Sequence, residues 1–478
     1  MSNQAPDDSH GAIPSSVDER MHRKELSQRE IALGLSGVAV SATIVAFDAT
    51  IISTILPEVA NSLDGMGLYS WAAAAYFLAV SCTILVFGRL SDLVGRKALM
   101  LCSLLVVSVG SMTGGLANGM EVLIVGRVIQ GIGGGMLIGT AFAAPADLLP
   151  DPKVRVKWMA FLSATYAVAS AAGPALGGAL TESFGWRAAF FVIPLTAVCA
   201  APLLWAFYPP WRRALAAPLK MDWLGLLLLV YALGVPLMAL EQFARPDSTW
   251  PDWLEWSLIV SGFVAGWLLL KWEKTQSTPM FPVRILRTLP ARLLNLSSVI
   301  SGAVMFSLIY YVPLLLQASF NLSPTTAGLL IAPIVAGAPV GSIINGRLFA
   351  HVKNPQYIML TGALILAAGC GLLLTLTEQS SLRVILLIMG LCGVGLGLLL
   401  SNYNLLMQIV VGHDNVGAGT GLIQTTRALG SAIGTTLVGL AIAHSSIKAG
   451  IQLSLAVCVV LCLVTAYLTW RTRLPEQD

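Results

Sequence analysis

Long apolar stretches recur along this chain and limit its possible folds more than any other feature of the sequence. A helix needs about 20 mainly apolar residues to cross about 30 Å of hydrocarbon. Backbone polar groups in hydrocarbon must find partners within the same element, and these stretches are too long for barrel strands, so we predict helices. We expect fourteen membrane-spanning helices, over residues 31–56, 69–87, 98–117, 121–143, 157–180, 187–208, 222–241, 253–271, 291–316, 325–349, 356–376, 382–403, 421–443 and 449–470.

The composition agrees with an all-α polytopic membrane protein that has the lipid bilayer as its main partner. The chain is 56% apolar and 11% charged, whereas soluble domains are about 45–50% apolar and about 25% charged. The net charge of +4 is small, and no basic stripe stands apart from the apolar stretches, so we expect no nucleic-acid partner. All seven cysteines lie in apolar stretches, which favours buried thiols over a disulfide framework or a metal site.

The distribution of positive charge predicts the orientation. Lys and Arg gather in loops on the cytoplasmic side of membrane proteins. Only Arg187, Arg245, Arg383 and Lys448 fall in the segments opposite the N-terminus. We therefore expect a multi-pass protein of the cell (cytoplasmic or inner) membrane with both termini in the cytoplasm. Residues 1–30 are expected to form a cytoplasmic tail without a cleaved signal peptide, and 471–478 a short second tail.

Three pairs of short motifs indicate an internal repeat. Gly173-Pro-Ala-Leu-Gly177 aligns with Gly430-Ser-Ala-Ile-Gly434, and similar matches join Leu123–Gly126 to Leu387–Gly390 and Gly88–Leu90 to Gly346–Leu348. The three matches occur in the same order and at nearly equal separations. We predict two six-helix halves, 31–208 and 291–470, joined by a linker at 209–290 that carries two inserted helices. Two such repeats with a central site suit alternating access.

Asp48 is the one acid that we place near the middle of the membrane. A charge at a helix centre costs roughly 2.5–3.5 kcal/mol on insertion scales and usually marks an ion or substrate path. Arg127 falls at a compatible depth in the helix predicted over 121–143, so the two can pair. We predict that Asp48 and Arg127 couple transport to protons, with a static packing pair as the alternative. An Asp48 facing the cavity could also bind a proton and a cationic substrate in competition.

The segment after the second predicted helix is expected to form a cytoplasmic gating loop, with a plain loop as the alternative. Its glycines would permit a tight turn, and its bases would anchor it at the inner membrane face. Asp92 would dock at the positive N-terminal end of the helix that begins near Gly419–Gly421 and hold the cytoplasmic gate shut in the outward-facing state. The predicted loop residues are Gly88, Arg89, Asp92, Gly95, Arg96 and Lys97.

Gly173, Pro174, Gly177 and Gly178 are expected to serve either as a hinge or as a close-packing surface. Small residues four apart allow helices to approach closely, and a proline within a helix removes one backbone hydrogen bond and bends it. The spacing leaves both interpretations open.

Polar and aromatic side chains within the spans are candidates for a substrate cavity, although each could instead pack against other helices. Arg427, near the inner end of the span 421–443, could snorkel to the interface or neutralise an anionic substrate or lipid. The full set is Gln130, Phe306, Tyr310, Tyr311, Asn402, Tyr403 and Arg427.

These motifs, in this order, resemble the major facilitator superfamily over residues 31–470. Asp48-Ala-Thr-Ile51 with Leu56-Pro57, and the central helical pair, resemble its fourteen-helix drug:proton antiporter branch. So do Phe184-Gly-Trp-Arg-Ala-Ala-Phe-Phe191 and Pro279-Met-Phe-Pro-Val-Arg284. The resemblance implies proton-driven export of hydrophobic, often cationic compounds (multidrug efflux), with the roles given above for Asp48, Arg127 and the two glycine-rich motifs.

The resemblance has departures. Ala188 stands where the family often has a tryptophan, and the asparagine often found before the following proline is missing. Ala350 stands where the repeat would place the equivalent of Asp92, so the second half lacks a complete gating loop.

Other functions fit the sequence less well. No phosphate-binding Gly-x-x-x-x-Gly-Lys-[Ser/Thr] loop is present, so we expect a proton gradient, with no cofactor, to drive transport. The five histidines are scattered, and we see neither paired acids nor rings of pore charges, which disfavours a membrane-embedded enzyme or a channel. A carrier of a specific metabolite or siderophore remains the alternative within transport. We predict a monomer that binds protons and a small-molecule substrate.

Overall fold

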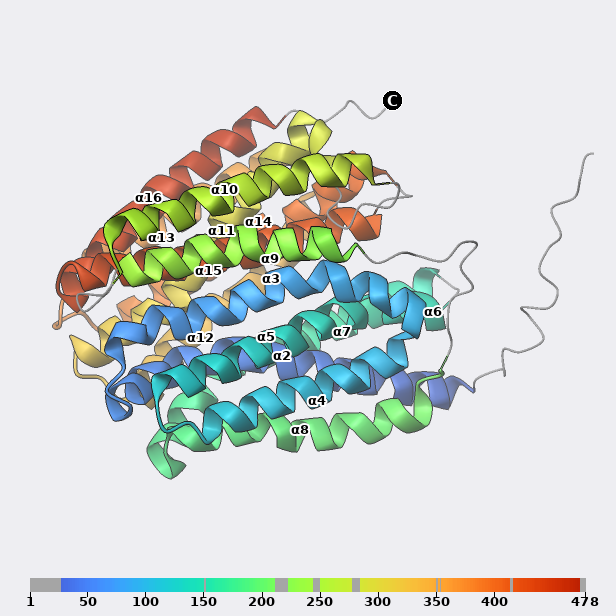
Figure 1. Ribbon diagram of the computed structural model, residues 1–478, viewed down its shortest axis with the longest axis horizontal. Helices are drawn as coiled ribbons and strands as arrows, with labels where there is room; N and C mark the ends of the chain where they lie inside the picture. The colour runs from blue at the N-terminus through green and yellow to red at the C-terminus, as the bar shows by residue number, and fades with distance from the viewer. Residues whose placement is uncertain are drawn as a thin grey trace, which may run out of the picture.

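The computed structural model describes residues 27–149, 152–210, 222–243, 250–276, 284–349, 351–352, 354–412 and 416–472. Within these ranges, fourteen helices are long and apolar enough to cross a membrane. They run side by side along the long axis of the molecule (Figure 1). Most of the predicted tails (1–26 of 1–30 and 473–478 of 471–478), residues 279–283 of the motif before the ninth span, and Ala350 lie outside the described residues.

The first half begins at a capping box, in which the Ser27 hydroxyl and the Glu30 carboxylate each accept a backbone N–H of the other residue. Such reciprocal bonds satisfy donors that a helix start leaves free. The six long helices of this half are α2 (Gln28–Ser62), α3 (Tyr69–Val94), α4 (Arg96–Gly115), α5 (Met120–Ala141), α7 (Pro152–Phe184) and α8 (Trp186–Phe207), with the short helices η1 (Met66–Leu68) and α6 (Ala144–Leu148) in the connections.

The second half and the insert account for the other eight spans. The insert is a pair of antiparallel helices, α9 (Trp223–Phe243) and α10 (Asp252–Thr275), followed by the short helix η2 (Ile285–Arg287). The second half comprises α11 (Leu289–Ala318), α12 (Pro324–Phe349), α13 (Gln356–Leu374), α14 (Leu382–Val411), α15 (Val416–Ala443) and α16 (Ile447–Arg471). All fourteen predicted spans coincide with these helices.

The same pairs of helices pack together in each half, as expected for a structural repeat. The contacts of α5 with α3 and α4 correspond to those of α14 with α12 and α13. The contact of α2 with α7 corresponds to that of α11 with α15. The aligned glycines Gly177 and Gly434 lie at equivalent close approaches of two helices. A Cβ atom added at Gly177 would lie 2.8 Å from the Ile51 carbonyl oxygen on α2, and one added at Gly434 would lie 2.6 Å from Ala303 Cα on α11.

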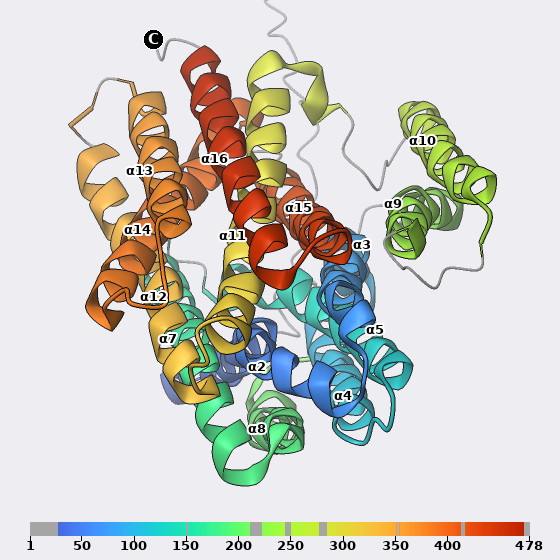
Figure 2. The ribbon, with the colours of Figure 1, turned by 90° about the vertical axis from the view of Figure 1, so that its left-hand side faces the viewer.

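The two halves meet mainly where α3 packs on α15 and α7 packs on α12, and α2 also contacts both α11 and α12. The inserted pair lies outside this arrangement, with α9 against α3 and α15 (Figure 2). We call the end of the molecule where α2 begins and α16 ends the terminal face, and the opposite end, which faces the viewer in Figure 2, the far face. Large apolar side chains cover the outside, among them Trp205, Phe263 and Leu195, which suits a lipid surrounding.

One predicted loop is largely helical. α3 continues to Val94, so Gly88, Arg89 and Asp92 lie within this helix and not in a loop. The turn is confined to Gly95, which has φ +100°. Only glycine adopts this backbone conformation without strain. The expectation of a turn is thus correct for Gly95 and wrong for Gly88, whose Cβ position faces the Gly139 carbonyl oxygen on α5 at 3.5 Å.

Candidate functional site

A buried ion pair joins the first and fourth spans in the middle of the first half. Arg127 Nη1 on α5 donates to Asp48 Oδ1 on α2 at 3.1 Å. Asp48 is 2% exposed and Arg127 is fully buried. The predicted pairing of these two residues is therefore present. A buried ion pair of this kind offsets the large cost of removing two charges from water only when its geometry and its further hydrogen bonds are good.

Gln130 completes this cluster. Its side chain accepts from Arg127 Nη1 at 2.9 Å and donates to Asp48 Oδ1, also at 2.9 Å. Gln130 lies three residues after Arg127, which places both side chains on one face of α5. It was predicted to line the substrate cavity, but it belongs to the ion-pair cluster.

The Tyr76 ring on α3 lies between the ion pair and a cavity. The Arg127 guanidinium carbon is 4.2 Å from the centroid of this ring, which is a cation–π contact. Two guanidinium nitrogens of Arg127, Nε and Nη2, are buried without a hydrogen-bond partner among the described residues. Unpartnered buried donors are uncommon in folded proteins and require an explanation.

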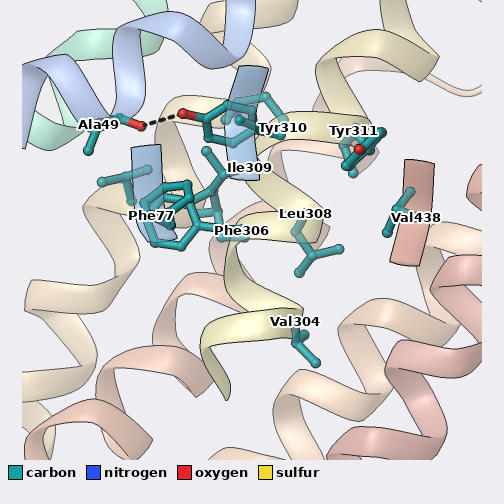
Figure 3. Packing of buried hydrophobic residues seen from close by; sticks show 14 of the residues in the cluster. Ala49, Phe77, Val304, Phe306, Leu308, Ile309, Tyr310, Tyr311 and Val438 are labelled. Carbon is teal, nitrogen blue, oxygen red and sulfur yellow. Dashed lines mark hydrogen bonds between the residues drawn. The ribbon is translucent and has the colours of Figure 1, made fainter. Parts of the chain in front are cut away.

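The cavity between the two halves has a volume of about 50 Å³. Phe77 of α3 and Phe306 of α11 form part of its wall, with ring centroids 4.1 Å apart (Figure 3). Sites for drug-sized molecules usually measure about 300–1,000 Å³, so the cavity must widen before such a molecule enters. Its other aromatic and polar lining residues are Tyr76, Tyr166, Gln424, Arg427 and Ser431. Phe306 and Arg427 both line this cavity, and their role in binding a substrate stays a prediction.

Asp48 is not among the residues that line this cavity. Val45 and Ala49, its neighbours on α2, do line it. Successive residues of a helix are turned by about 100°, so the face that presents Val45 and Ala49 to the cavity turns Asp48 toward α5. The expectation that Asp48 faces the cavity directly is wrong for this arrangement.

Hydrogen bonds between the halves close the molecule on the far side of the cavity. The Tyr310 hydroxyl on α11 donates to the Ala49 carbonyl at 3.2 Å (Figure 3), and the Tyr69 hydroxyl donates to the Tyr310 carbonyl at 2.9 Å. Gln317 Nε2 donates to the Thr54 carbonyl at 3.0 Å. Tyr310, predicted as a cavity residue, is therefore part of this closure.

The glycine motif of α7 contributes to the same closure. A Cβ at Gly173 would contact the Thr50 hydroxyl on α2, whereas one at Gly178 would contact the Pro324 carbonyl on α12. The Pro174 carbonyl accepts the Thr54 hydroxyl at 2.9 Å and faces the Cβ position of Gly328 on α12. The close-packing interpretation of the motif agrees with these contacts, and they extend to both halves.

Glu182 is a residue of this closure that the sequence interpretation missed. Its carboxylate accepts the Thr325 backbone N–H at 2.9 Å, across the two halves. Its position at the end of a span gives no signal in the sequence of a partner 143 residues away in the chain.

The gating segment has an ion pair that was also missed. The Arg96 guanidinium pairs with the Asp147 carboxylate of α6 and donates to the Ser91 hydroxyl at 3.0 Å. Arg96 is only 9% exposed, so it does not anchor the segment at a solvated interface as predicted. The side chain of Asp92 lies outside the described residues, and its docking stays a prediction. Gly421 in α15 does lie against Leu85 of α3, at 3.1 Å from its Cβ position.

Three of the predicted cavity residues make side-chain hydrogen bonds to other residues of the second half. Asn402 Nδ2 donates to Asn345 Oδ1 at 2.7 Å between α14 and α12. The Tyr403 hydroxyl lies 2.7 Å from the Ser301 hydroxyl, and the Tyr311 hydroxyl donates to the Thr435 carbonyl at 2.7 Å. None of the three lines the cavity described above, and their role in a substrate cavity stays a prediction.

The inserted pair contains two buried acids that we did not predict. Glu255 is 2% exposed and Glu273 is 1% exposed, near opposite ends of α10. Within the described ranges, no group of three or more His, Cys, Asp or Glu side chains could hold a metal ion.

This arrangement defines a class of protein. A helical bundle with fourteen candidate membrane spans, built from two equivalent halves around a cavity, has the architecture of a secondary transporter. The sequence profile of the Major Facilitator Superfamily matches residues 38–435 and 294–477, and the chain belongs to this family. It is thus a membrane transporter and not an enzyme.

Several relatives carry names that refer to multidrug transport or resistance, or to efflux. The chain is 28% identical over 418 residues to multidrug transporter protein MdtP of Bacillus subtilis, covering 87% of this chain and 76% of the relative. It is 28% identical to multidrug resistance protein 3 of the same organism (87% and 80% covered), and 30% identical to efflux pump roqT of Penicillium rubens (81% and 72%). With its fourteen candidate spans, the chain fits the fourteen-helix drug-efflux branch.

A solved structure shares the fold. A bacterial homolog of the human lysosomal transporter Spinster, in an inward-facing and unoccupied conformation, superposes with a TM-score of 0.66 over 93% of this chain and 97% of that one. The sequence identity is 16%, so the likeness concerns the fold alone.

Proposed function

We propose that the protein exports hydrophobic small molecules in exchange for protons, by alternating the access of its central cavity between the two sides of a cell membrane. The observation that carries this proposal is the buried Asp48–Arg127 pair beside the cavity. Ionisable residues inside a membrane mark ion or substrate paths by default. Relatives named efflux pumps support the direction of transport, and relatives named for multidrug transport and resistance support the substrate class.

The proposed coupling step is a proton transfer to Asp48. A proton on the carboxylate removes its charge and therefore most of its attraction for Arg127. The guanidinium already has two buried nitrogens without partners, so a second arrangement could give these donors the acceptors that they lack here. Tyr76 contacts Arg127 and also lines the cavity. A movement of the guanidinium would therefore shift the Tyr76 ring and change the shape of the substrate site.

We also propose that the terminal face lies in the cytoplasm. Lys and Arg are enriched in the cytoplasmic loops of membrane proteins. Four such residues lie at the helix ends that form the terminal face, namely Arg96, Lys97, Arg347 and Arg471. With this orientation, the closed far side faces the exterior and the cavity lies toward the cytoplasm. Labelling of single cysteines from outside intact cells tests the orientation, since a cysteine at Gln379 should react and one at Ser27 should not.

The test of proton coupling uses proteoliposomes with an internal pH-sensitive dye, an imposed pH gradient and a panel of hydrophobic substrates. The variant is Asp48→Asn, and Asp64→Asn is its matched control. Asp64 is exposed, and its φ of +48° is one that asparagine also tolerates. We expect Asp48→Asn to bind substrate without substrate-driven proton flux, and Asp64→Asn to behave as wild type. Normal proton-coupled flux in Asp48→Asn would exclude Asp48 as the proton carrier.

A further inference from the structure

The cavity carries one charged side chain among its described lining residues, and that charge is positive. Arg427 of α15 lines the cavity, and no aspartate or glutamate does. The nearby Asp48 lies beside the wall and not in it, and its charge is balanced by Arg127. An arginine stays protonated at any physiological pH. The charge seen by a molecule in the cavity is therefore that of Arg427.

Arg427 makes no ion pair or side-chain hydrogen bond with any residue in the described part of the chain. It lies eleven residues after the start of α15 at Val416, which is about 16 Å along the helix. That distance exceeds the length of an arginine side chain, so Arg427 cannot snorkel to the terminal face. Its backbone at this point packs against Gly302 of α11, which fixes the position from which the side chain extends.

Gln424 lies beside Arg427 with an unused polar group. It precedes Arg427 by three residues, so both side chains leave the same face of α15, and both line the cavity. The Gln424 Oε1 atom is buried without a hydrogen-bond partner, but as an acceptor it cannot bind an anion. A side-chain amide also has two N–H donors. The guanidinium and the amide together form a polar end of the cavity that can donate hydrogen bonds to one acceptor group.

Another part of the wall is aromatic. Phe77 and Phe306 are in contact, and Phe77 lies edge-on to Tyr76 with centroids 5.2 Å apart. Aromatic walls of this kind bind planar apolar molecules through burial and ring contacts. The cavity thus combines an aromatic side with a cationic, hydrogen-bond-donating side.

We propose that the cavity selects aromatic organic anions, with the anionic group bound by Arg427 and Gln424 and the ring held against Phe77 and Phe306. This inference rests on the proposed function in taking the cavity as the substrate site. A carboxylate matches the planar fork of a guanidinium with two parallel hydrogen bonds. A cationic compound would instead meet an uncompensated positive charge in a medium of low dielectric constant.

The test measures binding to the purified protein in nanodiscs, without any ion gradient, by radioligand scintillation proximity. Three probes share one ring system: 2-naphthoate (anionic), 2-naphthamide (neutral) and 2-naphthylmethylammonium (cationic). The variants are Arg427→Gln and Arg427→Lys, with Arg383→Gln as the control, since Arg383 is exposed at the start of α14.

We expect wild type and Arg383→Gln to bind 2-naphthoate at least about 10-fold more tightly than the other two probes. Arg427→Gln should lose this preference, with a much smaller loss of affinity for 2-naphthamide than for 2-naphthoate, and Arg427→Lys should keep part of the preference. The inference is overturned if wild type prefers the ammonium, fails to bind 2-naphthoate, or if Arg427→Gln keeps the anion preference. The comparison of the three probes on the wild-type protein does not depend on the folding of any variant. Because no gradient is applied, a failure of proton coupling leaves this result unaffected.

Discussion

The contact between α7 and α12 makes a quantitative prediction about the opening of the far side. In the closed arrangement, a methyl group added at Gly178 would lie 2.6 Å from the Pro324 carbonyl carbon and 2.7 Å from Thr325 Cα. Carbon atoms pack at about 3.5–4.0 Å. These neighbours are backbone atoms, which cannot rotate away, so Gly178→Ala forces the two helices apart by roughly 1 Å, the difference between these separations.

The expected size of the effect follows from the cost of overpacking. Extra methyl groups in well-packed sites typically cost about 1–3 kcal/mol. This cost applies only where α7 and α12 are in contact, whereas the gain in helix propensity from Gly to Ala applies in every conformation and cancels. Gly178→Ala should therefore shift the equilibrium toward molecules with an open far side by about 5- to 150-fold.

Distances between spin labels at Asn61 and Gln379 test this shift by electron–electron double resonance in nanodiscs. Both residues are exposed near the far ends of the two halves, and the exposed Cys102 and Cys199 are first replaced by serine. We expect a larger long-distance population in Gly178→Ala than in the parent protein.

Gly346→Ala is the matched control for this experiment. Gly346 lies in α12, and nothing lies within 4 Å of its Cβ position. It should leave the distance distribution unchanged. An unchanged distribution in Gly178→Ala, or an equal change in Gly346→Ala, would refute the reasoning.

Two further predictions concern contacts at the terminal face. Asp147→Asn leaves the nearly buried Arg96 without its carboxylate, and it should lower the apparent unfolding temperature in detergent because a weakened hydrogen bond to a charged group costs about 1.5–3 kcal/mol. An unchanged temperature would contradict a stabilising role for this pair. Trp272→Phe removes the indole N–H that donates to both Asp222 carboxylate oxygens, at 3.0 and 2.9 Å. It should speed hydrogen exchange, measured by mass spectrometry, at the start of α9, and unchanged exchange there would contradict this.

The ion pair could be predicted from the sequence because it depends on depth along two helices. Asp48 and Arg127 are rare charges in apolar spans, and a charge buried in a membrane needs a partner. Their depth follows from the residue count, so the pairing could be inferred without knowing how the helices pack. The fold could be predicted for a related reason, since the length of the apolar stretches alone determines where the spans occur.

The cavity residues were harder to predict because periodicity carries little information in this chain. In a soluble helix the apolar stripe identifies the buried face. In a membrane, lipid-facing and core-facing sides are both apolar, so the sequence did not distinguish Phe306, which lines the cavity, from Tyr311 and Tyr403, which bond to other residues of the second half. The partners of Arg96 and Glu182 were missed because they lie far away in the chain.

The position of the inserted pair has a mechanical consequence for a transporter of this design. α9 contacts α3 in one half and α15 in the other, and the pair is tight within itself, with the Cβ position of Gly262 directly against the Pro236 ring. A rigid pair that touches two bodies in relative motion cannot follow both of them. If the halves rock, α9 must therefore slide along α3 or along α15.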